Sequence, residues 1–94
     1  DRMVSEEDAR RRQKASLDEL ILELTEERGA DKTVCPSEVA RAKRKENWQQ
    51  LMGEIRVRAV KLADAGQIAI YRKGKPVDPH DFKGVYRLGL PDTE

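Results

Sequence analysis

Hydrophobic residues recur with the period of an α-helix in the first third of the chain. Four aliphatic positions at i, i+3, i+4 and i+7 share one face of such a helix, namely Leu17, Leu20, Ile21 and Leu24. Ser16 and Glu19 have the spacing of a capping box before this stripe, and Gly29 supplies a C-terminal stop after it. The pattern predicts a helix over residues 17–28.

A second, shorter helix is predicted over residues 36–44. Cys35 stands at its N-cap, Pro36 has the fixed φ that suits the first helical position, and Glu38 can bond back to the cap. Cys35 is the only cysteine of the chain, and its neighbours are helix-start residues. We therefore interpret Cys35 as a packed junction residue rather than a reactive thiol.

The third helix, predicted over residues 48–65, has the strongest pattern. Asn47 and Gln50 have the spacing of a second capping box at its start, and Gly66 ends it. An apolar sector of about 120° runs along the helix and is formed by Trp48, Leu51, Met52, Ile55, Ala59, Leu62 and Ala63.

The hydrophobic period then changes to two. Residues 67–72 and 85–90 alternate and predict two strands, with a turn signal at residues 73–76. The connection between the strands is about twelve residues long. Thr33 and Val34 are expected to add a short third strand.

This order of elements predicts the fold. Helices, a tight turn, a longer helix and a hairpin follow one another as in a winged helix-turn-helix. We expect an α+β domain over residues 16–90, with three helices followed by a two- to three-stranded antiparallel hairpin sheet. Residues 1–15 mix both charges with little apolar content, which indicates a flexible arm or, alternatively, an extra solvated helical turn. Residues 91–94 are expected to be a polar tail.

Charge is balanced overall but unevenly distributed. The chain has 19 Lys and Arg against 18 Asp and Glu, so its net charge of +1 indicates no particular partner. Residues 29–66 carry 8 basic and 5 acidic side chains, whereas residues 1–28 carry 6 and 9. An anionic partner can therefore be indicated only by the local excess of basic residues in the middle of the chain.

In a helix-turn-helix the second helix of the pair enters the major groove of double-stranded DNA. Residues 48–65 would be that helix, because Gln reads adenine and Arg reads guanine. The expected DNA contacts are Gln49, Gln50, Arg58 and Lys61 on this helix, Arg41, Lys43, Arg44 and Lys45 before it, and Arg72, Lys73 and Lys75 on the hairpin. Transcriptional regulation is the expected setting. The alternative is an ordinary solvated face, in which Glu54 would repel phosphates.

A protein-interaction module without nucleic-acid binding is the competing function. Val57 and Val60 lie outside the apolar sector of the third helix and could form a homodimer or partner surface. Isolated exposed valines are also common on ordinary surfaces.

Other classes are not indicated by the sequence. His80 and Cys35 have no partners at metal-ligand spacing, and no phosphate-binding glycine motif occurs, so we expect no enzyme, metal or cofactor. No segment has the apolar length of a membrane span, and we expect a cytoplasmic protein.

Several segments also resemble one protein family. They are KTVCPSEVAR at residues 32–41, Trp48 with Leu51 and Met52, Ile55 with Arg56, Leu62 with Ala63, Gly66 to Ile68, and Val77 to Pro79. This combination is similar to small bacterial proteins known only as domain of unknown function family 3253, over roughly residues 17–90. The resemblance implies a winged-helix fold and carries no established activity.

Overall fold

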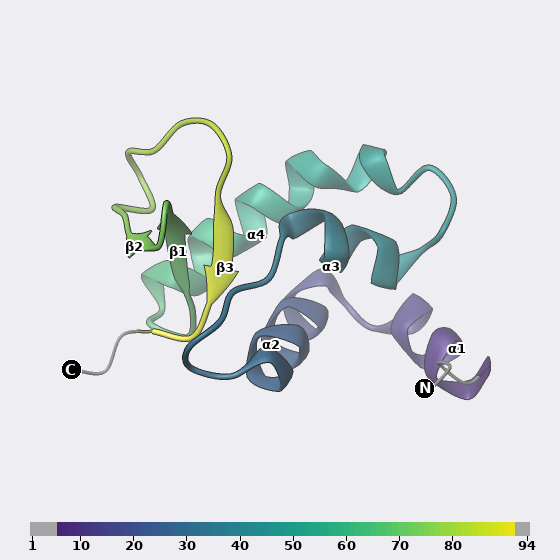
Figure 1. The fold of residues 1–94 in the computed structure, drawn as a ribbon. Helices are drawn as coiled ribbons and strands as arrows, with labels where there is room; N and C mark the ends of the chain where they lie inside the picture. The colour runs from purple at the N-terminus through teal and green to yellow at the C-terminus, as the bar shows by residue number, and fades with distance from the viewer. Residues whose placement is uncertain (1–5, 92–94) are drawn as a thin grey trace.

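The computed structural model describes residues 6–91, and the first and last few positions of the predicted arm and tail lie outside this range. The fold is α+β, with helices and a small antiparallel sheet (Figure 1). In chain order the elements are α1 (Glu6–Lys14), α2 (Leu17–Arg28), α3 (Pro36–Lys43), the 3₁₀-helix η1 (Trp48–Leu51), α4 (Met52–Asp64), β1 (Ala69–Arg72), β2 (Lys75–Pro76) and β3 (Arg87–Gly89). None of the helices within residues 6–91 has the length and apolarity that crossing a bilayer requires.

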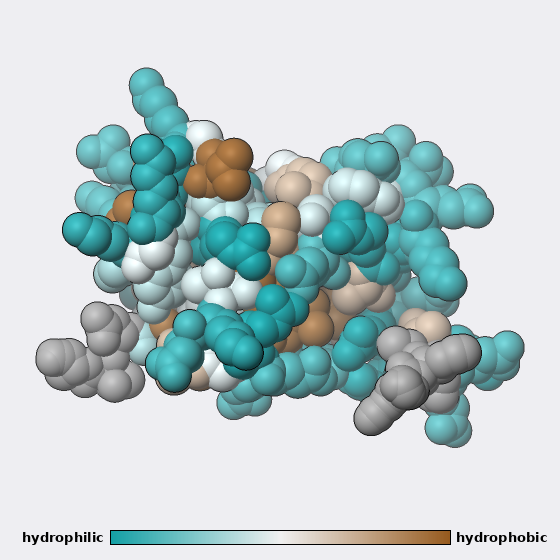
Figure 2. Space-filling model, viewed as in Figure 1, coloured by the Kyte–Doolittle hydropathy of each residue, from teal (hydrophilic) through white to brown (hydrophobic). Residues whose placement is uncertain are grey.

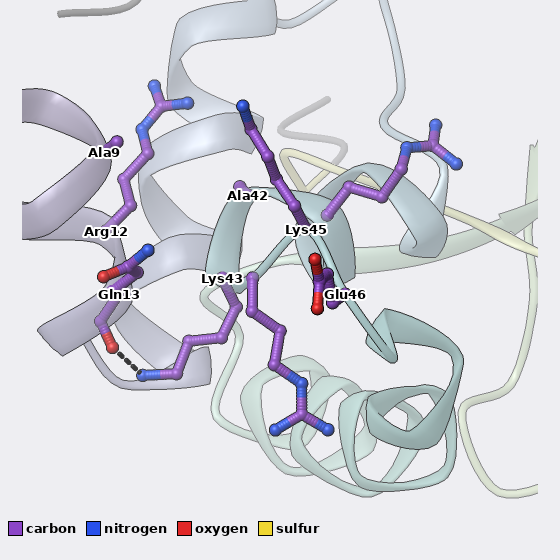
Figure 3. A pocket seen from close by; sticks show the side chains of 9 residues that line it. Ala9, Arg12, Gln13, Ala42, Lys43, Lys45 and Glu46 are labelled. Atoms are coloured by element: carbon purple, nitrogen blue, oxygen red, sulfur yellow. Dashed lines mark hydrogen bonds between the residues drawn. The ribbon is translucent and has the colours of Figure 1, made fainter. Parts of the chain in front are cut away.

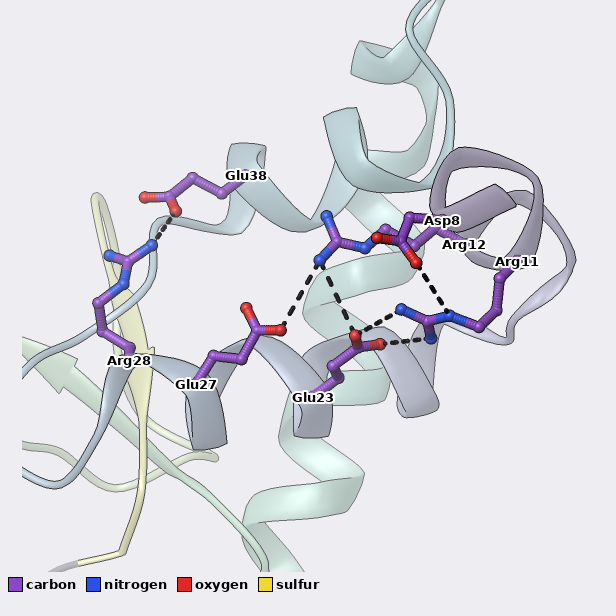
Figure 4. Close-up of polar contacts among 7 residues, drawn as sticks. All are labelled: Asp8, Arg11, Arg12, Glu23, Glu27, Arg28 and Glu38. Atoms are coloured by element: carbon purple, nitrogen blue, oxygen red, sulfur yellow. Dashed lines mark hydrogen bonds and ion pairs between the residues drawn. The ribbon is translucent and has the colours of Figure 1, made fainter. Parts of the chain in front are cut away.

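The described residues form four α-helices, so the prediction of three is wrong. The additional helix is α1, within the stretch for which the sequence indicates a flexible arm or, alternatively, an extra solvated helical turn; residues 6–14 of this stretch are helical. It buries no residue, and it carries acidic side chains in its first turn and basic ones in its last, which complements the helix dipole. Polar contacts hold it to α2: the Arg11 guanidinium donates two hydrogen bonds, of 3.1 and 2.9 Å, to the Glu23 carboxylate (Figure 4).

Helices α2 and α3 begin as the sequence predicts. Ser16 caps α2, since its Oγ accepts from the Glu19 amide at 3.1 Å while the Glu19 carboxylate accepts from the Ser16 amide at 2.9 Å. Glu38 likewise accepts from the amide of Cys35, the N-cap residue of α3, at 3.3 Å. Glu38 is also paired with the Arg28 guanidinium, which joins the end of α2 to the start of α3 (Figure 4).

The predicted capping box at Asn47 is not formed. Asn47 adopts a left-handed conformation with φ of 59° and makes no side-chain cap, and the first turn after it is the 3₁₀-helix η1. The Gln50 carboxamide oxygen accepts instead from the Arg44 guanidinium at 3.0 Å. The single long helix predicted over residues 48–65 is therefore divided into η1 and α4.

The sheet has the strand order β2-β1-β3, and both pairings are antiparallel. Lys73 and Gly74 both have positive φ, of 52° and 82°, as the two-residue turn between β1 and β2 requires. The expected third strand at Thr33 and Val34 is reduced to one bridge, in which Val34 and Leu88 exchange backbone hydrogen bonds of 2.7 and 2.8 Å.

The core lies where α2, α3, α4 and the sheet meet. Its largest buried apolar side chains come from all of these elements and include Leu20 and Ile21, Val34, Val39, Ile55, Ile70 and Leu88. In Figure 1 the sheet lies near the C-terminal end of α4, while α1 lies at the opposite end of the molecule beside α3.

Truncation of Leu88 tests this arrangement. Leu88→Ala removes a fully buried side chain from the strand that pairs with both β1 and Val34. We expect the free energy of unfolding to fall by about 2–5 kcal/mol, measured by urea denaturation. Val85→Ala, at a residue that is 81% exposed three positions away, should change it by less than about 0.5 kcal/mol. Equal effects of the two substitutions would contradict the packing described.

Candidate nucleic-acid interface

Helix α4 turns one face to the core and the opposite face to solvent. Its buried residues are Ile55, Ala59 and Leu62. Its exposed residues are Gly53, Glu54, Val57, Lys61 and Asp64. Lys61 is the one basic side chain of this exposed set and stands against two carboxylates, so the face by itself does not attract an anion. Gln49 and Gln50 are exposed in η1, at the leading end of the helix.

Arg58, the predicted guanine-reading residue, is engaged within the fold. Its Nε and a terminal nitrogen donate to the two carboxylate oxygens of Asp18 at 2.7 and 2.6 Å, which ties α4 to the first turn of α2. The hydrogen bonds from Arg58 hold the pKa of the Asp18 carboxyl below its ordinary range. The guanidinium edge formed by Nε and Nη2, one of the edges suited to bidentate recognition, is thereby engaged by Asp18.

Lys43 is likewise withdrawn from the predicted set of contacts. Its Nζ donates to the backbone carbonyls of Gln13 and Ala15, at 2.6 and 2.5 Å. These carbonyls lie at the C-terminal end of α1, where a cation compensates the helix dipole and the unpaired carbonyl groups. No sequence pattern links residues so far apart, so sequence analysis could not have foreseen this role.

The other predicted cations of the turn after α3 remain near solvent. The Arg41 guanidinium lies 5.0 Å from the centroid of the Trp48 ring, a cation–π arrangement. Arg44 donates to the Asn47 carbonyl as well as to Gln50, and thereby shapes the turn. Lys45 is exposed and forms no ion pair with any residue in the range 6–91.

The hairpin supplies a second group of basic side chains. Arg72 donates through Nε to the Val85 carbonyl at 2.8 Å and so fastens β1 to the loop over residues 77–86. Lys73, Lys75 and Lys83 are exposed, and none of them forms an ion pair within the described part of the chain. The hairpin cations that are free for a ligand are therefore the three lysines.

Arg56 is a positioning residue that the sequence does not reveal. Its guanidinium lies 4.0 Å from the centroid of the Phe82 ring and 5.7 Å from that of Tyr86, and it donates to the Phe82 carbonyl at 3.0 Å. It therefore attaches the loop over residues 77–86 to α4. The aromatic residues are visible in the sequence, but their approach to α4 depends on the tertiary fold.

The two valines expected to form a partner surface differ in their environment. Val57 is 53% exposed on α4, whereas Val60 is partly buried and packs against the core. Val85, which the sequence places in a strand, is instead in the loop before β3 and is 81% exposed. Figure 2 shows a mostly hydrophilic face with separate small hydrophobic spots.

Cys35 and His80 both have polar partners. Partial burial raises the pKa of the Cys35 thiol, but hydrogen bonding to Ser37 and the nearby Arg87 charge outweigh it, so this pKa lies below its ordinary range. The Cys35 Sγ is 3.1 Å from the Ser37 Oγ. The His80 Nε2 lies 2.8 Å from the Asp64 carboxylate and links the loop to the end of α4. Among residues 6–91, no three His, Cys, Asp or Glu side chains come together as metal ligands would.

Fold and surface together define a small α+β domain, in which a solvent-facing helix lies between two basic segments. Residues 14–91 match the family model described as Protein of unknown function (DUF3253). The chain therefore belongs to this family, and the resemblance carried by the KTVCPSEVAR segment is confirmed. A search among curated proteins gives no match.

The Asp18–Arg58 pair predicts a pH-dependent contribution to stability. The pKa of Asp18 is lowered by folding, so the pair stabilises the native state above the unfolded-state value of about 3.9 and loses this effect as the pH falls through the folded-state pKa. Asp18→Asn should lower the free energy of unfolding by about 1 kcal/mol at neutral pH, with a smaller difference in acid. Urea denaturation across this pH range measures it. Glu26→Gln, on an exposed residue of α2, is the control; an equal loss there would contradict the assignment.

The environment of Cys35 predicts its labelling profile. Because its pKa is lowered, the rate of reaction with iodoacetamide should rise with a midpoint below that of an unperturbed cysteine thiol. Ser37→Ala removes a hydrogen bond that favours the thiolate and should move this midpoint upward. A midpoint at or above that of a free cysteine peptide in the wild-type protein would refute the prediction.

Proposed function

We propose that the protein is a winged-helix DNA-binding protein. The observation that supports the proposal is the order of the elements along the chain: α2, the bridge at Val34, α3, α4, β1 and β3. Val34 pairs with Leu88 on the edge of β3 opposite to β1. In this reading α3 and α4 form the helix-turn-helix, and residues 73–86 form the wing. Helix α1 is an addition before the domain.

The arrangement of basic groups supports contact with the phosphate backbone. In Figure 1 the turn after α3 lies at one end of α4 and the hairpin at the other. The cations that the fold leaves available are Arg41 and Lys45 at the first end and Lys73, Lys75 and Lys83 at the second. Arg44 at the first end is also exposed but donates to Asn47 and Gln50. Two cationic groups separated by a helix suit a duplex, because its phosphates border the groove that the helix would enter on both sides.

The same geometry limits sequence recognition. Arg58 is bound to Asp18, so the side chains that can reach base edges are Gln49 and Gln50 in η1, before the start of α4. Gln50 already accepts a hydrogen bond from Arg44. Glu54 lies on the exposed face of α4 and opposes close approach to phosphate. The proposed binding is therefore dominated by phosphate contacts and strongly salt-dependent. A role in transcriptional regulation, in the DNA-containing cytoplasm, is the setting that we propose for it.

A protein-interaction module is the second candidate function. The specific observation in its favour is the exposure of two aliphatic side chains, Val57 at 53% and Val85 at 81%. In this alternative the winged-helix scaffold would present α4 and the loop over residues 77–86 to a protein partner or a second copy of the chain.

Charge reversal on the hairpin tests the DNA proposal. Lys73→Glu combined with Lys75→Glu should weaken binding of a short fluorescent duplex by roughly tenfold or more, because it removes two cations and adds two repulsive charges. Fluorescence anisotropy at several salt concentrations measures both the affinity and its salt slope, to which each neutralised phosphate contributes about −0.9.

Lys32→Glu is the matched control, because Lys32 is an exposed lysine in the loop between α2 and α3. It should weaken binding much less than the hairpin double variant. No binding of the wild-type protein at low salt would overturn the DNA proposal and favour the interaction module. Because Lys32→Glu changes the net charge by half as much as the double variant, a loss of binding free energy half as large in the control would show that net charge, rather than the hairpin, carries the effect.

A further inference from the structure

A groove of about 570 Å³ lies between α1 and the end of α3, away from the exposed face of α4. Its walls come from Arg12 and Gln13 of α1, and from Arg41, Lys45 and Glu46 at the end of α3 and in the turn after it. Figure 3 shows the side chains of Arg12 and Lys45 extending from opposite walls toward the same side of the groove, while Lys43 turns away to the Gln13 carbonyl.

The lining is strongly cationic. Five basic residues line it against one carboxylate, that of Glu46. Lys43 contributes its charge although its donors are directed to the carbonyls of α1, and Arg44 is directed to Gln50. The donors that remain for a ligand belong to Arg12, Arg41 and Lys45.

Arg12 has a buried donor that is left without a partner among residues 6–91. Its side chain is only 19% exposed, and its two ion pairs, with Glu23 and Glu27, are both long at 3.8 Å and use the same terminal nitrogen (Figure 4). Its Nε is buried and has no hydrogen-bond partner among residues 6–91. A guanidinium has five N–H donors, and leaving a buried one unpaired is costly. A small shift of this side chain toward an anion in the groove would satisfy donors that the protein leaves unpaired.

We propose that this groove binds the phosphate or diphosphate group of a small molecule. A phosphate group offers several oxygens and more than one negative charge, which matches an Arg and a Lys that converge from two walls better than a single carboxylate does. The groove shares Arg41 and Lys45 with the turn cations of the proposed DNA surface, but its other wall is α1, and Arg12 of α1 has no part in that surface.

Ligand binding also stabilises the position of α1. This helix buries no residue and is attached by polar contacts, so its docking depends on a few charged groups. A phosphate group held by Arg12 on one wall and Lys45 on the other adds a bridge across the groove. Occupancy therefore increases the population in which α1 is docked.

Titration with inorganic pyrophosphate at low ionic strength tests the site, followed by calorimetry and by backbone amide NMR shifts. We expect saturable binding at one site per chain, with the largest shifts in α1 and in the turn after α3. Arg12→Gln and Lys45→Gln should each weaken binding by about tenfold or more, because each removes a charge-assisted donor. Lys45 lies outside α1, so its variant tests the groove even if Arg12→Gln undocks the helix.

Arg10→Gln is the matched control. Arg10 lies on the same helix, is 63% exposed and pairs with Glu6 rather than lining the groove. Its substitution should leave pyrophosphate affinity unchanged. Titration of the wild-type protein with citrate should give weaker binding than pyrophosphate.

Three outcomes would overturn the proposal: no saturable pyrophosphate binding, equal weakening in the Arg10 variant, or citrate binding as tight as pyrophosphate. DNA affinity of the Lys45 variant separates the two sites. If this variant loses pyrophosphate binding but its DNA affinity falls only as much as expected for the loss of one lysine among several phosphate contacts, the result supports a separate small-molecule site. If Arg12→Gln weakened duplex binding as much as it weakened pyrophosphate binding, the groove would instead belong to the DNA surface, and the small-molecule proposal would be overturned.

Discussion

The paired backbone of Val34 and Leu88 is the constraint on which the rest of the structure depends. These residues are both fully buried and exchange two hydrogen bonds, so the connection between α2 and α3 becomes part of the sheet. The chain then enters α3 at once, because Cys35 is the N-cap and Pro36 the first helical residue. A single bridge thus joins the helical half of the chain to the sheet and fixes the direction of α3. Helix α4 then packs against α2, α3 and β1, the elements that this junction brings together.

Charged side chains join elements that the small hydrophobic core does not hold together by itself. With 37% hydrophobic and 39% charged residues, the chain has limited apolar material. Pairs between elements therefore recur: Arg58 joins α4 to α2 through Asp18, and Arg28 joins α2 to α3 through Glu38. Arg56 joins α4 to the loop over residues 77–86 through the Phe82 ring. Basic residues that have become structural in this way cannot also serve as ligand contacts. The basic residues that remain available lie on the hairpin and around the groove between α1 and the turn after α3.

The sequence predicts those parts of the fold whose signals are local. Ser16 and Glu19 mark the start of α2, Pro36 marks α3, and the glycine after Lys73 marks the turn of the hairpin, because each acts on backbone within a few residues. The same reasoning fails at Asn47, where the capping pattern is present but the Arg44 guanidinium takes the Gln50 side chain. It fails again for the helix count, because α1 has no apolar stripe and is held by partners on α2 and α3.

By itself, then, the sequence determined the boundaries of α2 and α3, the α+β class and the family. The signals for these are the hydrophobic period, the helix caps and a characteristic segment, and each depends on residues that are close together in the sequence. Tertiary structure alone decided which cations are free. Lys43 and Arg58 look like exposed ligand contacts in the sequence, yet their partners, Gln13 and Asp18, stand 30 and 40 positions away. The same holds for the groove, whose walls at Arg12 and Lys45 meet only because α1 packs beside the end of α3. Whether a basic side chain is free for a ligand depends on the groups that lie beside it in the folded protein, and a local sequence pattern does not contain that information.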